Sequence, residues 1–222
     1  MKDKFIKRSY LAEFTSDEEK PGSIRGVPIV FDQATDIGGM FREIIRPGAI
    51  SEALLKREIK LFENHNIHGS KAMASTLIPI DKLGGMVLTK RLDRIEMDAL
   101  LNLERTDSKD FYLAVRDGTM SGMSFMFSIK AQTWTDLDTD YPTRYIEEID
   151  EIVEVSGVNY PAYKGTSIST TSTGLRSIES SENDLSVLEK ARRDHLHTRS
   201  AETEQLELLK LKNKNLFIGG RF

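Results

Sequence analysis

The sequence of 222 residues contains no cysteine. This absence excludes disulfide bonds, a thiolate nucleophile and a zinc site with cysteine ligands. Long apolar runs are also missing, and none approaches the roughly 20 residues that a membrane-spanning helix needs. The first residues, 1–5, lack the apolar stretch of a secretory signal peptide. These absences predict a soluble protein that stays where it is made.

The chain also lacks a large excess of charges of one sign. The chain has 31 Lys and Arg residues against 35 Asp and Glu residues, which gives a net charge of −4. Dedicated nucleic-acid-binding proteins normally carry a strongly basic face, and the sequence shows no such bias. Neither a nucleic-acid partner nor a membrane partner is therefore predicted. The length is sufficient for one well-formed hydrophobic core.

The pattern of apolar residues is mostly that of short strands separated by turns. Strand-like stretches fall at residues 5–14, 24–31, 41–45, 60–65, 92–103, 121–131 and 145–158, and residues 77–88 suggest strands around a turn, although 92–103 also allows a helix. In 121–131 the apolar residues Met123, Phe125, Phe127 and Ile129 alternate with Ser124, Met126 and Ser128, so Ser124 can face a cleft while the other face packs inward. Helical spacing occurs at residues 49–59, with Ser51 as a candidate N-cap, and at 108–116. This distribution predicts a mainly β protein, an antiparallel β-barrel or sandwich with a few peripheral helices. The regular strand–helix alternation of a doubly wound parallel sheet is not seen.

The composition changes after Pro161, which suggests three parts. Residues 1–164 read as the folded domain. Residues 165–183 are rich in serine and threonine and read as a flexible linker. Residues 184–222 are charged and have leucines at helical spacing, which predicts a helical tail that docks on a partner or is mostly solvated.

Three short patches contain the side chains of an activated-serine hydrolase: His65 at the end of an apolar run, Ser124 in a glycine-flanked strand, and Glu154 in a strand that ends at a proline. Each has a plainer interpretation. Ser124 could be an ordinary polar position on a half-exposed strand, with Ser121 as a rival hydroxyl. His65 could cap a strand end, or form a two-histidine metal site with His68, although no third ligand has convincing spacing. Glu154 lies close to an acidic run that could simply be solvated.

The order of these patches and the residues around them resemble the sequence motifs of the prohead protease family of tailed bacteriophages. The resemblance rests on four motifs in sequence: E-x-I-x-P-G-A at 43–49, N-H at 64–65, G-M-S-F at 122–125 and E-V-S-x-V-x-x-P-A at 154–162. It covers roughly residues 20 to 165. One departure is Gly157, where the family commonly has a larger apolar residue.

The resemblance implies a serine endopeptidase that cleaves capsid and scaffold proteins inside the immature head, in the cytoplasm of the host. In that reading Ser124 is the nucleophile, His65 the general base and Glu154 the residue that orients His65, with no metal and no cofactor. The implied fold is similar to that of the herpesvirus assembly proteases, a β-barrel with peripheral helices. Those enzymes use a second histidine in place of the carboxylate, so His68 is a minor alternative to Glu154.

Further expectations follow from the same resemblance. The enzyme is expected to cut itself, and the segment 165–183 is an exposed place for the cut. A homodimer is expected by analogy with the herpesvirus enzymes. The donors that stabilise the oxyanion are not identified, although backbone amides near Ser124 or in the turn at residues 116–118, and the Arg116 side chain, are candidates.

Two other function classes compete with the protease. A non-catalytic capsid scaffolding protein on the same fold would use the charged tail to assemble subunits. A hydrolase of small esters is the weaker alternative, because the sequence contains no Gly-x-Ser-x-Gly elbow.

Overall fold

The computed structural model describes residues 5–10, 14–17, 19–159 and 174–218. The strands are β1 (Ile6–Tyr10), β2 (Phe14–Ser16), β3 (Ser23–Val30), β4 (Thr35–Ile37), β5 (Phe41–Ile45), β6 (Lys60–Glu63), β7 (Ala74–Ser75), β8 (Gly85–Lys90), β9 (Arg94–Leu100), β10 (Gly122–Thr135) and β11 (Thr143–Val158). The helices are the short 3-10 helix η1 (Pro47–Ala49), α1 (Glu52–Leu55), α2 (Thr106–Arg116) and α3 (Gly174–Ile218). The prediction of a mainly β protein with few helices and a helical C-terminal segment is confirmed.

The prediction that the sheet is antiparallel is wrong, because the strands form one mixed sheet. Its main path runs β1-β10-β11-β6-β7-β8-β9-β3-β2, and β5 joins it through β11. β11 pairs in parallel with both β5 and β6, and β7 pairs in parallel with β8. β11 has 16 residues, so the two short strands pair with different parts of it. Neither strand is joined to β11 by a hairpin, so hairpin geometry does not fix their direction.

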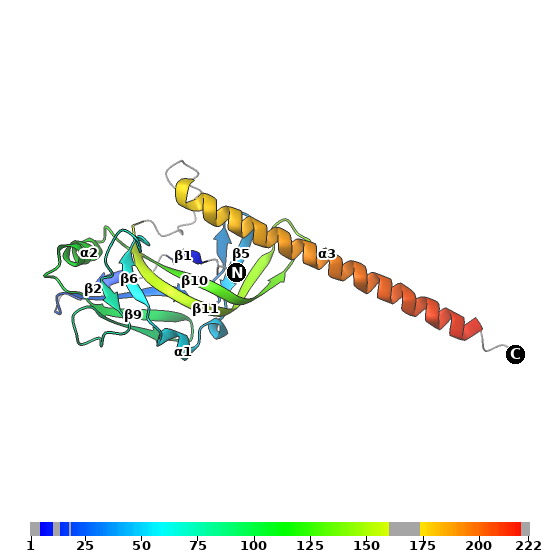
Figure 1. The fold of residues 1–222 in the computed structure, drawn as a ribbon, viewed down its shortest axis with the longest axis horizontal. Helices are drawn as coiled ribbons and strands as arrows, with labels where there is room; N and C mark the ends of the chain where they lie inside the picture. The colour runs from blue at the N-terminus through cyan, green and yellow to red at the C-terminus, as the bar shows by residue number, and fades with distance from the viewer. Residues whose placement is uncertain (1–4, 11–13, 18, 160–173, 219–222) are drawn as a thin grey trace.

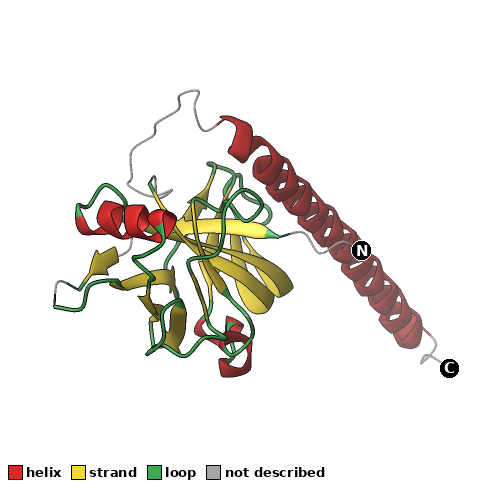
Figure 2. Ribbon diagram, turned by 60° about the vertical axis from the view of Figure 1, so that its left-hand side comes forward, coloured by secondary structure: helices red, strands yellow, loops and turns green. Residues whose placement is uncertain are grey.

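The sheet curls into a half-barrel, which Figure 2 shows in side view. Its longest element is the β10–β11 hairpin, whose register runs from Gly122 opposite Val158 to Thr135 opposite Thr143. The register shifts at several points between Met126 and Gln132. Such bulges bend and twist the strands, which accounts for the curl of the hairpin.

The hydrophobic core is built mainly from side chains of β3, β6, β8, β9, β10 and β11. Met123, Phe125 and Phe127 of β10 are fully buried in the core as predicted, but Ser124, Met126 and Ser128 on the other face of the strand are buried as well. Helix α2 closes one end of the core with Phe111, Tyr112 and Val115.

The helix predicted at residues 49–59 is much shorter in the structure. Helix α1 spans only four residues, and Ser51 caps it as predicted, its Oγ accepting from the Leu54 N–H at 3.2 Å. The helix ends because the chain turns at once toward β6. There the Ile59 N–H donates to Thr76 Oγ1 at 2.9 Å instead of to a helical carbonyl.

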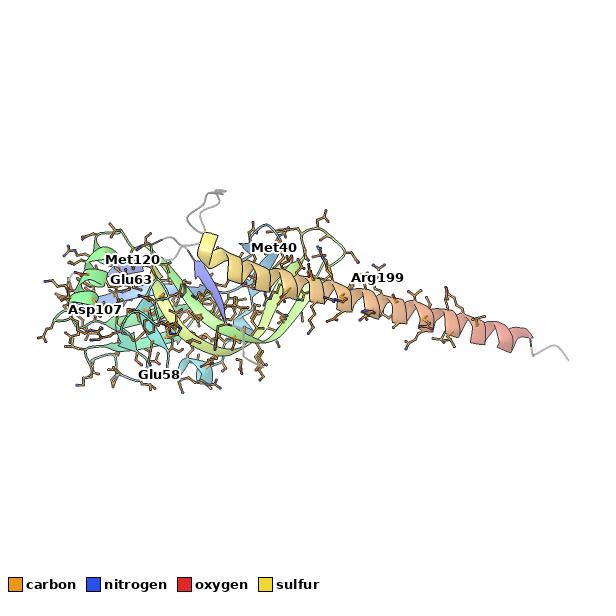
Figure 3. The ribbon with its side chains drawn as sticks, turned by 45° about the horizontal axis from the view of Figure 1, so that its top comes forward. Met40, Glu58, Glu63, Asp107, Met120 and Arg199 are labelled. Atoms are coloured by element: carbon orange, nitrogen blue, oxygen red, sulfur yellow. The ribbon has the colours of Figure 1, made fainter. Side chains whose placement is uncertain are left out.

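Helix α3 begins at Gly174, so its first turns lie within the segment predicted as a linker, and residues 165–173 lie outside the described residues. The helix packs beside β4 and β5, where Leu188 is buried with Ile37 and Phe41, and Met40 packs against this cluster (Figure 3). Beyond this contact it extends away from the sheet (Figure 1), and its described leucines from 196 onward are exposed. Among the helices of the described ranges, none is long and apolar enough to cross a membrane.

Four buried charged side chains connect β1, β5, β11 and α3. Arg8 Nε lies 2.5 Å from Glu43 Oε1, and Arg8 Nη2 lies 3.2 Å from Asp184 Oδ1. Arg144 Nη1 lies 3.4 Å from both carboxylates. Burial alone would raise the pKa of Glu43, but the charges of Arg8 and Arg144 and the hydrogen bond from Arg8 outweigh it, so this pKa is lowered. The two arginines and two carboxylates therefore balance one another, and the cluster holds α3 against the sheet.

Candidate active site

His65 lies just beyond the end of β6, in a turn with unusual backbone geometry. Asn64 and His65 have φ angles of 48° and 59°, the left-handed region that non-glycine residues adopt rarely. Two contacts to β11 hold the turn: the Asn64 N–H donates to the Gly157 carbonyl at 2.9 Å, and the His65 N–H donates to Ser156 Oγ at 3.2 Å. Consecutive residues of this kind tend to occur at functional sites, where the surrounding structure fixes them.

The side chain of His65 is paired with Glu154. The Nδ1 atom lies 2.6 Å from Glu154 Oε1, and the two side chains are 7% and 0% exposed. An ionised carboxylate can only accept a hydrogen bond, so this contact places the imidazole proton on Nδ1. The other ring nitrogen, Nε2, is then the one with a lone pair that can accept a proton.

Ser156 is a member of this group that the sequence analysis missed. Its hydroxyl donates to Glu154 Oε2 in a short hydrogen bond and also accepts the backbone N–H of His65. Ser156 is fully buried. The signal was present in the sequence, because residues two apart on a strand share a face, and the Glu-Val-Ser spacing puts both polar side chains on the same one.

Ser124 lies next to this group through the pairing of β10 with β11. Ser124 is opposite Ser156 in the register, and Met126 is opposite Glu154. Directly opposed residues in an antiparallel pair lie about 4.5–5.5 Å apart and share a face of the sheet. Ser124 is fully buried, and its hydroxyl donates to the Arg8 carbonyl of β1 at 2.8 Å. The three residues singled out from the sequence thus come from three neighbouring strands and meet in one region.

The rival candidates occupy different surroundings. Ser121 is exposed and precedes β10, and His68 is exposed in the loop after β6. Arg116, at the exposed end of α2, donates from Nε to Asp117 Oδ1 at 2.9 Å. Across the described part of the chain, no group of three or more His, Asp or Glu side chains is arranged to hold a metal ion.

A hollow of about 380 Å³ opens beside the His65 turn. It is lined by Glu63, Ala114, Thr119, Met120 and Asn159, and Figure 3 shows Glu63 and Met120 side by side at this end of the molecule. The Asn159 N–H donates to Asn64 Oδ1 at 3.2 Å, so the hollow and the His65 turn share a wall.

The model of the caudovirus prohead serine protease family matches residues 11–182 of this chain. The chain belongs to this family. The resemblance inferred from the four sequence motifs is therefore confirmed, and the family is one of serine peptidases. Comparison with curated proteins and with solved structures finds no match.

The match to the prohead proteases includes His65, Ser124, Ser156 and Glu154. It excludes strand β1, which ends at residue 10, and all of α3 beyond residue 182. The matched range therefore includes the strands that carry the site, whereas β1 and most of α3 lie outside it.

Proposed function

We propose that this protein is the endopeptidase that cleaves capsid and scaffold protein during prohead maturation, with Ser124, His65 and Glu154 as its catalytic group. The observation that carries the proposal is the buried hydrogen bond between His65 and Glu154 beside Ser124. This pairing leaves a basic imidazole nitrogen next to a strand serine in a family of serine peptidases.

The reaction follows from the chemistry of these groups. Ser124 Oγ attacks the carbonyl carbon of the scissile peptide bond, while His65 Nε2 takes the hydroxyl proton. The imidazolium that forms is stabilised by Glu154 through Nδ1. The tetrahedral intermediate collapses, the C–N bond breaks, and His65 returns the proton to the leaving amine. Water, deprotonated by His65, then attacks the acyl carbon, the ester bond to Ser124 Oγ breaks, and His65 returns the proton to Oγ as the second product leaves.

Ser156 has a positioning role in this proposal. By donating to Glu154 it fixes the carboxylate, and by accepting from the His65 backbone it fixes the turn that carries the imidazole. Since the two polar contacts come from one buried hydroxyl, a rotation of Ser156 would disturb both partners of the hydrogen-bonded pair.

We also propose where the enzyme acts and which proteins it cleaves. The substrates are the major capsid protein and its scaffold segment, encountered inside the prohead in the host cytoplasm. The enzyme also cuts itself between residues 165 and 183, and it works as a homodimer. The exposed leucines of α3 support a targeting role for the tail, because an amphipathic or leucine-bearing helix is a common docking element.

Co-expression with the major capsid protein tests the proposal. Wild type is expected to shorten the capsid protein on a denaturing gel, and Ser124→Ala is expected to leave it intact while both variants remain folded by circular dichroism. Ser121→Ala is the matched control, since it removes the rival hydroxyl. Shortening by Ser124→Ala would refute the assignment, whereas no shortening by wild type together with normal head assembly would favour a scaffolding protein.

A further inference from the structure

Strand β1 lies against the residue proposed as nucleophile. β1 is the edge strand of the sheet and pairs antiparallel with β10, with Ser9 opposite Ser124 and Arg8 opposite Phe125. The Ser124 hydroxyl is 2.8 Å from the Arg8 carbonyl oxygen, and Ser124 has no exposed surface. A nucleophile must come within van der Waals distance of the substrate carbonyl carbon before it reacts. A substrate cannot reach Ser124 while the residue is buried in this way.

The contact with Arg8 also directs the Ser124 proton away from catalysis. A serine hydroxyl has a single proton, and a carbonyl oxygen can only accept a hydrogen bond. While that proton is donated to Arg8, it cannot be donated to the imidazole of His65. The base therefore cannot take it, and the hydroxyl stays a weak nucleophile.

The side chain of Arg8 holds β1 in this position. It is buried, and it makes ion pairs with Glu43 on β5 and with Asp184 on α3. A buried arginine is stable only when its charge is paired, so moving β1 outward requires both pairs to open or to be hydrated. The strand is thus fixed from two separate elements of the fold.

The family match gives independent support that β1 is not part of the catalytic framework. The match begins at residue 11, directly after β1, and covers β3 to β11. The edge of β10 that β1 occupies is a row of backbone donors and acceptors, which an extended peptide can pair with in the same way.

We propose that β1 is an autoinhibitory strand that occupies the place of the substrate. An extended segment of the substrate protein binds along β10 in the register that β1 now holds, and Ser124 becomes reactive when β1 leaves. The inference rests on the proposed function, since it assumes that Ser124 is the nucleophile. Strand addition supplies affinity through the backbone, and hollows beside the strand, such as the one lined by Glu63, then select side chains.

A disulfide that locks β1 onto β10 tests this inference in the full chain. The protein has no cysteine, so the intended bond is the only disulfide that Lys7→Cys combined with Met126→Cys can form within one chain. These residues are opposite one another in the register, and opposed residues in an antiparallel pair are about 4.5–5.5 Å apart, which suits a disulfide. Oxidation is expected to slow cleavage of the major capsid protein by about tenfold or more, because the competent state can no longer be populated. Dithiothreitol should restore the rate in the same sample.

The matched control is a second engineered disulfide far from Ser124. Arg25 and Asp98 are opposite one another in the antiparallel pair of β3 and β9, so Arg25→Cys with Asp98→Cys should form a comparable bond. Its oxidation is expected to leave cleavage almost unchanged. Mass spectrometry shows whether the disulfide between β1 and β10 has formed. If it has formed and the oxidised protein cleaves as fast as the same protein treated with dithiothreitol, the inference is overturned while the proposed function stands.

A variant that loosens β1 gives the opposite test. Arg8→Gln removes the charge that pairs with Glu43 and Asp184, and it is expected to speed the labelling of Ser124 by a fluorophosphonate, with Ser124→Ala as the blank. Unchanged labelling in a folded Arg8→Gln protein would count against the inference, and if the variant does not fold, the disulfide experiment decides alone. No cleavage by wild type, by the reduced double-cysteine protein or by Arg8→Gln would overturn the proposed function and this inference together.

Discussion

The Nδ1 atom of His65 lies 2.6 Å from Oε1 of Glu154, although the two residues are 89 positions apart in the sequence. The contact depends on the parallel pairing of β6 with β11, in which Glu63 is opposite Gly157. Because β6 ends at that level, the left-handed turn at Asn64 and His65 brings the imidazole back over the preceding residues of β11. A mixed sheet is therefore a requirement of this site and not only a detail of its topology.

Replacement of Glu154 by glutamine should impair catalysis without unfolding the protein. The amide has the same size as the carboxylate, but it cannot balance the charge of an imidazolium and can favour the wrong imidazole tautomer. By comparison with other serine peptidases, kcat is expected to fall by on the order of 10⁴-fold. Capsid-protein cleavage and a thermal melt measure the two effects. Glu151→Gln, on an exposed position of the same strand, should behave like wild type; equal rates for both variants would rule out an orienting role for Glu154.

Ser156→Ala tests the positioning role of the hydroxyl that sequence analysis missed. A hydrogen bond to a charged group contributes roughly 1.5–3 kcal/mol, which corresponds to a loss of about 10- to 160-fold in kcat if it acts wholly through orientation. Ser156→Thr retains a hydroxyl and should recover part of the rate. The pH dependence of kcat should shift in the alanine variant and return in the threonine variant. A kcat that falls only in step with the melting temperature would instead indicate a structural role.

Much of the site could be predicted from the sequence because its parts are local. Alternation along residues 121–131 correctly placed Met123, Phe125 and Phe127 in the core and Ser124 on the other face. The bounds of β5 and the end of α2 were predicted correctly, whereas α2 begins two residues before the predicted position 108. These features depend on residues close together in the sequence, so the spacing of apolar residues and the capping residues are enough to predict them.

The remaining features depend on contacts between distant segments. The parallel partners of β11 are chosen by packing across the half-barrel, and a short strand carries no sign of its partner's direction. The buried cluster of Arg8, Glu43, Arg144 and Asp184 joins residues that look like ordinary surface charges in the sequence. The same holds for Ser124, which was expected to face a cleft and is instead covered.

Gly157→Ala should destabilise the protein because the position has no room for a methyl group. A Cβ atom there would lie 2.7 Å from both Met120 Sδ and Phe111 Cε2, two side chains buried in the core. Overpacking of this kind costs typically about 1–3 kcal/mol of unfolding free energy, which urea denaturation can measure. The clash explains why glycine fits this position in the present core and a larger residue does not. Gly48→Ala, whose Cβ would meet nothing within 4 Å, is the matched control, and equal losses in both variants would contradict this account.

The charged cluster predicts a specific loss of stability in acid. The pKa of Glu43 is lowered in the folded protein from its ordinary value of 4.5. Its contribution to stability is therefore fully present above the unfolded value and is lost as the pH falls through the folded value. Glu43→Gln leaves two buried arginines short of a partner, so it should cost about 3–5 kcal/mol at pH 7, and the difference from wild type should shrink below about pH 4.5.

Urea denaturation of both proteins across this pH range measures the effect of Glu43. Glu96→Gln removes a half-buried carboxylate that is hydrogen-bonded to the exposed side chains of Arg91 and Arg94, and its effect should be small at every pH because solvent screens these ion pairs. A gap between wild type and Glu43→Gln that stayed constant from pH 7 to pH 3 would show that the charge of Glu43 does not stabilise the fold.

Leu188 is expected to decide whether α3 stays docked. It is 4% exposed and packs with Ile37 and Phe41, whereas Leu196, two turns further along the helix, is 60% exposed. Truncating a buried leucine to alanine typically costs about 2–5 kcal/mol. The buried ion pairs of Asp184 with Arg8 and Arg144 still hold the helix at Asp184, so Leu188→Ala should release α3 from Leu188 onward while leaving the half-barrel folded. Hydrogen exchange should rise along α3 but not in β10 or β11, and Leu196→Ala should change neither. If exchange rose in the strands as well, α3 would be an integral part of the fold and could not serve as a separable targeting arm.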